Sequence, residues 1–230
     1  MAERLSLSQD ELTEKRPYSI HADPKPAFPE LPVLPDNKDI IHFSKEHRKI
    51  LEKNSYQIFR LQGASIHDLC QLGFIKNLPL SPEIEAITAL PSEIAFNLKT
   101  GFKNIDTSEN LGRLTLPSRS FFVPDKKIKS GYRQISGLST AVANLATYSE
   151  LAFHYYQKTG LPLWTGDKKS RTGYLMTGSG PDVSHLYCFG GQPSRDIRPS
   201  IYSFDKSVNN IVNRLLLVVP NEVFRTLSTV

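Results

Sequence analysis

A helical pattern over residues 139–159 constrains the fold of this chain more than any other stretch. Its apolar side chains recur at three- and four-residue steps and so fall on one broad helix face. Ser136 or Ser139 can cap the start with a hydroxyl group. Gly160 can adopt the left-handed turn at the end, and Pro162 blocks continuation. We therefore predict a long amphipathic helix whose apolar face is buried against other elements.

Two titratable residues, Glu150 and His154, lie one turn apart on the polar face of this helix. Such a pair can act as an acid and a base in catalysis. A solvated pair at helix positions i and i+4 is the commoner arrangement, and we expect it here.

Four apolar segments after the helix have the length and composition of short strands. Residues 174–176 and 183–189 flank a turn of Gly, Ser, Pro and Asp, and we expect them to form a hairpin. Residues 201–204 are a third strand, and residues 214–219, apolar on both sides, are expected at the centre of a sheet. The predicted fold class is α+β, with one long amphipathic helix packed on a mostly antiparallel sheet.

Small helices are predicted in the N-terminal half. Residues 44–60 are expected to form a helix capped by Ser44, and residues 66–72 a shorter one capped by Ser65 and stopped by Gly73. Two helices joined by a short turn can read DNA, but the second offers almost no side chains for base edges. We expect both helices to serve packing.

Prolines interrupt the middle of the chain. Residues 83–90 leave room for at most a short helix, and residues 94–98 alternate as a strand does. Residues 101–112 are predicted to be a polar loop. Pro117 restricts residues 114–123 to an edge strand.

An extended proline-rich arm precedes the folded part. Its prolines recur every third residue, as in a polyproline II helix, so they share one edge and the apolar residues share another. The arm can bind a groove on a partner, or it can lie on its own domain or on a second copy. We divide the chain into a mobile tail with this arm, residues 1–36, and one α+β domain, residues 37–230. The prolines are Pro26, Pro29, Pro32 and Pro35, with Phe28, Leu31 and Leu34 between them.

The sequence argues against a secreted or membrane-spanning protein. The N-terminus is charged and lacks the apolar core of a secretory signal, and the longest apolar run, residues 215–219, is far too short for a membrane span. Cys70 and Cys188 lie far apart and are expected to be reduced core thiols, which favours a cytoplasmic location. The net charge of +5 permits an acidic partner without requiring one.

The sequence contains no catalytic or metal-binding motif. The turn TGSGP at residues 177–181 lacks the Lys-Ser/Thr pair of a phosphate loop and the spacing of a dinucleotide loop. None of the six histidines belongs to a zinc motif, and the two cysteines lack zinc spacing. We expect neither a cofactor nor a metal.

Residue types common in binding hot spots gather in two loops that follow the central helix. The predicted hairpin can bring these loops together at one end of the sheet as a recognition surface. The alternative is two unrelated polar loops. The predicted ligand- or partner-binding residues are Trp164, Asp167, Arg171, Tyr174, Arg195 and Arg198.

A basic segment at residues 113–133 carries six Lys and Arg residues against one acid, Asp125. Interleaved aromatic residues make it a candidate surface for a polyanion such as nucleic acid. The lysines crowd one turn and do not form a stripe, which favours a solvated loop.

The stretch from Thr147 to Pro220 resembles a segment of some uncharacterised bacterial proteins. The shared short motifs are ELAF, TG, W-T-G, RTG and LVVP, at residues 150–153, 159–160, 164–166, 171–173 and 217–220. The resemblance implies a bacterial origin and no particular activity. Some such proteins end in a C-type-lectin-like stretch, whereas Tyr202 and Asp205 stand here in place of its Trp and Gly.

Three function hypotheses come from these observations. The first is a non-catalytic protein that binds a protein partner, or a copy of itself, through the arm from Pro26 to Pro35 and the Trp164/Arg195 end of the sheet. The second is an enzyme or binder of a small anionic ligand held by an Arg/Trp cluster. The third, nucleic-acid binding through residues 113–133, is the least favoured. In the second hypothesis the anion contacts are Arg171, Arg195 and Arg198, and the proton-handling groups are Asp167, His185 and Glu150.

Overall fold

Two sheets and a set of helices make up the described part of the chain, so the α+β class is confirmed. The structure is a computed structural model. It describes residues 27–31, 40–76, 79–106, 122–124, 135–165, 173–181, 185–191, 197–205 and 211–224.

The first sheet is antiparallel throughout and has the order β1-β2-β10-β5-β4. Strands β1 and β4 are its edges, so the edge position predicted for residues 114–123 is confirmed for the part that the structure describes. The bounds are β1 (Gln57–Arg60), β2 (Glu93–Phe96), β10 (Leu217–Pro220), β5 (Leu138–Ala143) and β4 (Phe122–Pro124).

The second sheet has the order β3-β9-β6-β7-β8, and its one parallel pair is β6 with β9. The predicted hairpin is confirmed as β6 and β7, and the third predicted strand is β8. The loop predicted at residues 101–112 is wrong at its start, because β3 pairs with β9 over its whole length. The bounds are β3 (Phe102–Asp106), β9 (Ile211–Leu215), β6 (Gly173–Met176), β7 (His185–Gly191) and β8 (Ser200–Asp205).

The predicted strand at residues 214–219 is two strands that belong to different sheets. The chain leaves β9 at Leu215, passes Leu216 and enters β10 at Leu217. The Leu216 amide donates to the Gly101 carbonyl at 2.9 Å, so the crossing point is itself hydrogen-bonded. This stretch is apolar on both sides because it is buried in both sheets.

The central helix, α5 (Leu145–Thr159), is shorter than predicted. Its cap is Asn144, whose side-chain oxygen accepts from the Thr147 amide at 2.9 Å. The preceding residues form β5, which pairs with β10 on one side and β4 on the other. Those strands supply hydrogen bonds that a longer helix would have had to make internally. The predicted end is confirmed, since Gly160 has φ 67°.

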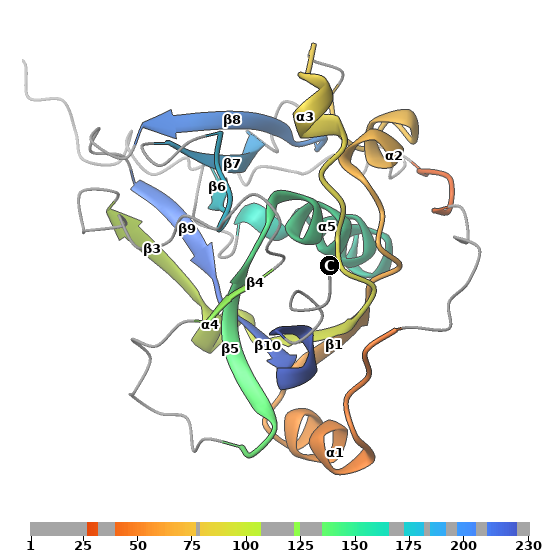
Figure 1. Cartoon of the computed structure of the whole chain (residues 1–230), viewed down its shortest axis with the longest axis vertical. Helices are drawn as coiled ribbons and strands as arrows, with labels where there is room; N and C mark the ends of the chain where they lie inside the picture. Colours follow the sequence, from red (N-terminus) through yellow and green to blue (C-terminus); the bar gives the residue numbers. More distant parts are fainter. Residues whose placement is uncertain are drawn as a thin grey trace, which may run out of the picture.

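Helix α5 lies between the two sheets (Figure 1), and most of its residues are buried, whereas Gln157 and Lys158 near its end are exposed. The ring of Tyr155 lies 6.3 Å from Phe59 and 5.9 Å from Phe96 in the first sheet. The Tyr148 hydroxyl donates to the Leu215 carbonyl of the second sheet at 2.5 Å. The prediction that this helix packs on one sheet is therefore wrong, because strands of both sheets contact it.

The predicted caps of the first two helices are confirmed. Ser44 caps α1, and Ser65 with Asp68 forms a capping box at α2. The helix predicted over residues 44–60 ends early, because Ser55 adopts φ 61° and the chain turns into β1. The helices are α1 (Lys45–Lys53), α2 (Ile66–Gln71), α3 (Pro82–Glu85) and α4 (Leu98–Gly101), with 3-10 turns η4 (Leu163–Thr165) and η5 (Asn221–Phe224).

Part of the proline-rich arm is described, and it lies on its own chain. The Phe28 ring packs edge-on against Phe74 at 5.4 Å and against Tyr156 at 5.7 Å, and Leu31 is buried. The apolar edge of residues 27–31 is thus covered in cis. The prolines Pro26, Pro32 and Pro35 lie outside the described residues.

Both cysteines are free and buried, in agreement with the prediction of core thiols. Burial raises the pKa of the Cys188 thiol to about 12 and that of Cys70 to about 11. Neither thiol is therefore activated as a nucleophile.

We predict that Asn144→Ala lowers the free energy of unfolding by about 1–2 kcal/mol. The variant loses the helix cap and also the bond from the Asn144 side-chain nitrogen to the Thr88 carbonyl at 2.9 Å. Urea denaturation followed by circular dichroism measures the change. Asn97→Ala, at the exposed cap of α4, is the control and should cost less. Equal losses would contradict the central place of α5.

Candidate functional site

The predicted recognition surface is only partly described, and one of its residues belongs to the core. Trp164 is fully buried, and its ring packs edge-on against Phe189 at 5.9 Å. Its carbonyl accepts from the Asn213 side chain at 3.0 Å. Trp164 therefore offers no surface to a ligand and joins η4 to the second sheet.

Tyr174 lies in an aromatic cluster on the second sheet, with ring distances of 5.1 Å to Tyr202 and 5.6 Å to Phe204. Burial raises the pKa of Tyr174, and neighbouring Tyr202 adds to the effect. Arg198 is exposed. Asp167, Arg171 and Arg195 lie outside the described residues, so the surface that they would share stays a prediction. The six basic residues of the 113–133 segment also lie outside them.

A different set of polar groups is brought together around Glu150, which is fully buried. Its carboxylate accepts from the backbone amides of Gln62 at 2.5 Å, Gly63 at 3.2 Å and Ala64 at 2.9 Å. Three amides converge because Gly63 has φ 92°, and a Cβ there would lie 2.8 Å from the Pro91 ring. The prediction of a solvated pair is therefore wrong, because the loop after β1 covers this face of α5.

His154 continues this network toward the surface. Its Nε2 lies 3.4 Å from the Glu150 carboxylate, and its side chain is 19% exposed. When Nε2 carries the proton toward the carboxylate, Nδ1 is left as an acceptor. The buried acid thus orients an imidazole whose other nitrogen can exchange a proton with a bound molecule.

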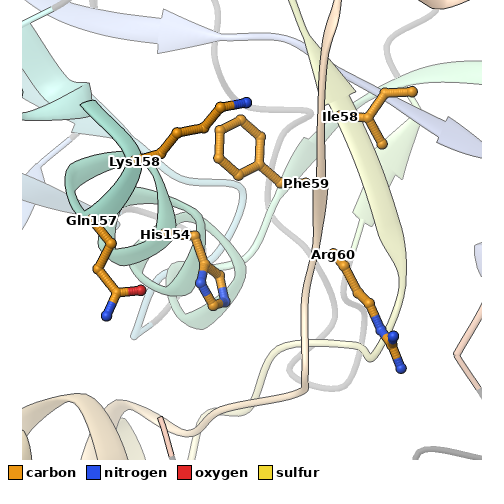
Figure 2. Close-up of a pocket in the computed structure, with 6 residues that line it drawn as sticks. All are labelled: Ile58, Phe59, Arg60, His154, Gln157 and Lys158. Atoms are coloured by element: carbon orange, nitrogen blue, oxygen red, sulfur yellow. The ribbon is translucent and has the colours of Figure 1, made fainter. Parts of the chain in front are cut away.

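His154 lines a groove of about 430 Å³ between β1 and α5 (Figure 2). Phe59 points from β1 toward the helix, while Ile58 and Arg60 lie on the opposite side of the strand. The Lys158 ammonium lies 5.0 Å from the centre of the Phe59 ring, a cation–π contact. On the α5 side the groove therefore offers the exposed Lys158 ammonium and one imidazole beside an aromatic floor, and the exposed Arg60 side chain lies on the other side of the strand. Its lining residues are Ile58, Phe59, Arg60, His154, Gln157 and Lys158.

A second lobe of about 450 Å³ adjoins the first on the α1 side of β1 and shares Ile58, Arg60 and Lys158 with it. Glu93 lies here with a side chain that is 5% exposed. It accepts from the Phe43 amide at 2.9 Å and pairs with Arg48, and His42 lies 3.2 Å away. Glu93 thus neutralises Arg48. The other residues of this lobe are Glu52, Tyr56 and Gln57.

Sequence reasoning missed Arg60, Lys158 and Glu93. Arg60 falls in a stretch predicted to be helical, and the sequence signal against that prediction is the Asn54-Ser55 pair that ends α1. Glu150 and His154 were recognised as a pair, but their burial depends on a loop that lies nearly ninety positions earlier in the chain.

No family model, curated protein or solved structure matches this chain. Within the described ranges, no three His, Cys, Asp or Glu residues are grouped to hold a metal ion. No helix among these residues has both the length and the apolar character to cross a membrane.

We predict that Glu150→Gln lowers the free energy of unfolding by about 3 kcal/mol. The amide places an N–H group among three backbone donors and removes the charge that they stabilise. Urea denaturation measures the loss, and hydrogen exchange of the Gln62, Gly63 and Ala64 amides should speed up. Glu52→Gln on exposed α1 is the control and should be near neutral. An unchanged midpoint for Glu150→Gln would show that the carboxylate does not hold the loop.

Proposed function

We propose that this protein binds an anionic ligand, bearing a phosphate or carboxylate group, in the groove between β1 and α5. Lys158 contacts the anion from the α5 side of β1 and Arg60 from the other side, and His154 donates to the anion or exchanges a proton with it. The ligand class is the one predicted from the sequence as an alternative, but the residues are different.

The charge around the groove supports the proposal. Both buried carboxylates are already occupied, Glu150 by three amides and Glu93 by Arg48 and the Phe43 amide. Arg60 makes no ion pair with any carboxylate in the described ranges, and Lys158 contacts the Phe59 ring. Glu52 is the acid that opposes these two cations in the adjoining lobe. Hydrogen bonds from such cations to an anion contribute about 1.5–3 kcal/mol each.

The Glu150–His154 contact favours a second candidate, an enzyme that acts on the same class of ligand. A buried carboxylate that orients an imidazole, with the second ring nitrogen near a groove, is the arrangement of a general base. His154 would then take the proton from a water or hydroxyl group of the bound ligand. Catalysis by this route requires that the His154 imidazole be held in one tautomer, whereas binding of the anion alone does not.

We predict that Arg60→Gln and Lys158→Gln each weaken the binding of pyrophosphate or citrate by on the order of tenfold. Isothermal titration calorimetry at low salt measures the affinity of each variant. Lys49→Gln, on the exposed face of α1 away from the groove, is the matched control. Equal affinities for all three variants would contradict the proposed site.

We predict that His154 is held as the Nε2–H tautomer, because its partner at 3.4 Å is a carboxylate that can only accept when ionised. Nitrogen-15 chemical shifts of the imidazole measure the tautomer. Glu150→Gln should abolish the preference, whereas Gln157→Ala, in the same groove, should leave it. A tautomer protonated on Nδ1 in the unaltered protein would remove His154 as a base.

A further inference from the structure

Strand β1 presents a backbone edge that no described strand covers, since it ends the order of the first sheet. The Leu61 amide donates to the Ser92 carbonyl at 2.8 Å, so residue 61 bonds toward β2. Bonding direction alternates along an antiparallel strand. The N–H and C=O groups of Ile58 and Arg60 therefore point away from β2, toward the open edge.

The open edge of β1 stops at Gln62, because the buried carboxylate of Glu150 occupies the next outward-pointing amide. By the same alternation the Gln62 amide points outward, and the Glu150 carboxylate accepts from it. Ile58 and Arg60 remain as two outward residues, two positions apart. This spacing is the one at which an added strand makes its hydrogen bonds.

The two lobes of the groove flank this edge on both faces of the sheet. Phe59 and Lys158 stand on the α5 side, whereas Arg60 lies on the opposite side of the strand (Figure 2). Side chains of a strand added to β1 would alternate between the two faces. Each lobe would thus receive every second side chain of such a strand.

We infer that the anionic ligand of this groove is an extended acidic peptide segment that adds to β1 as a further strand. The inference rests on the proposed function, because Arg60 and Lys158 supply the complementary charge. Main-chain bonds to Ile58 and Arg60 set the register, and acidic side chains contact the two cations.

Charge argues against a second copy of this chain as the occupant. Two β1 edges placed together would bring the cations Arg60 and Lys158 of each copy near one another across the junction. Like charges at close range are unfavourable, particularly where the two basic residues of each copy have one opposing acid, Glu52.

The test uses the six-residue peptide Val-Val-Glu-Glu-Val-Val with both ends blocked, because two adjacent glutamates of a strand point to opposite faces of the sheet. Fluorescence anisotropy measures its affinity for the full chain. A peptide with glutamine in place of glutamate removes only the charge. Two further peptides carry N-methyl groups, one at its odd-numbered residues and the other at its even-numbered residues. Each peptide loses the backbone N–H donors on one edge of the strand and keeps its side chains and charge.

We expect one of the N-methylated peptides to bind at least about tenfold more weakly than the parent peptide and the other to bind equally well. Only every second N–H group of an added strand points toward β1. The glutamine peptide should also bind about tenfold more weakly. Equal binding by both methylated peptides, or equal loss, would overturn strand addition. Tripolyphosphate that binds as tightly as the parent peptide would overturn the peptide as ligand but would keep the anion site.

The outcomes separate the two proposals. If Arg60→Gln and Lys158→Gln leave the affinity for the peptide unchanged, the anion site itself is wrong. If these variants weaken binding and no methylation pattern matters, the anion site stands without strand addition. A concentration-dependent dimer that the acidic peptide fails to dissociate, measured by light scattering, would point to self-association and overturn the inference.

Discussion

The buried carboxylate of Glu150 is the interaction on which the arrangement of helix, sheet and groove depends. A charge with no exposed surface costs several kcal/mol unless hydrogen bonds replace its water. Three amides of the loop at residues 62–64 and the His154 ring replace that water. Because these amides follow β1 directly, satisfying the carboxylate holds the end of β1 against α5. The groove lies beside the point where the end of β1 is held against α5.

The position of α5 between two sheets determines how the rest of the chain runs. A helix buried on both sides needs a sheet on each side, and a single chain must then cross from one sheet to the other. It crosses at Leu216, between β9 and β10, where the amide bonds to Gly101. The hydroxyl of Tyr148 bonds to the carbonyl of Leu215 next to this crossing, so the helix and the crossover stabilise each other.

Several features could be predicted because the interactions that form them lie within a few residues. The caps at Ser44 and Ser65 bond to amides three positions on, and Gly160 ends α5 by its own backbone conformation. The hairpin of β6 and β7 depends on a turn between adjacent strands. Length, apolar content and these local signals were sufficient for the α+β class. They were not sufficient for the number of sheets, which is a property of pairs that are distant in the chain.

What the sequence by itself determined is therefore local: the caps of α1 and α2, the end of α5 at Gly160, a hairpin and buried thiols. Tertiary structure decided the rest. Residues 138–143 have a helical pattern but form a strand because β4 and β10 lie on either side to pair with them. Arg60 reaches the groove because β1 is an edge strand, and Glu150 is buried because a distant loop folds over it. A periodic pattern shows which side chains are apolar. The residues that bury a polar side chain such as Glu150 come from distant parts of the chain, so the local sequence does not reveal them.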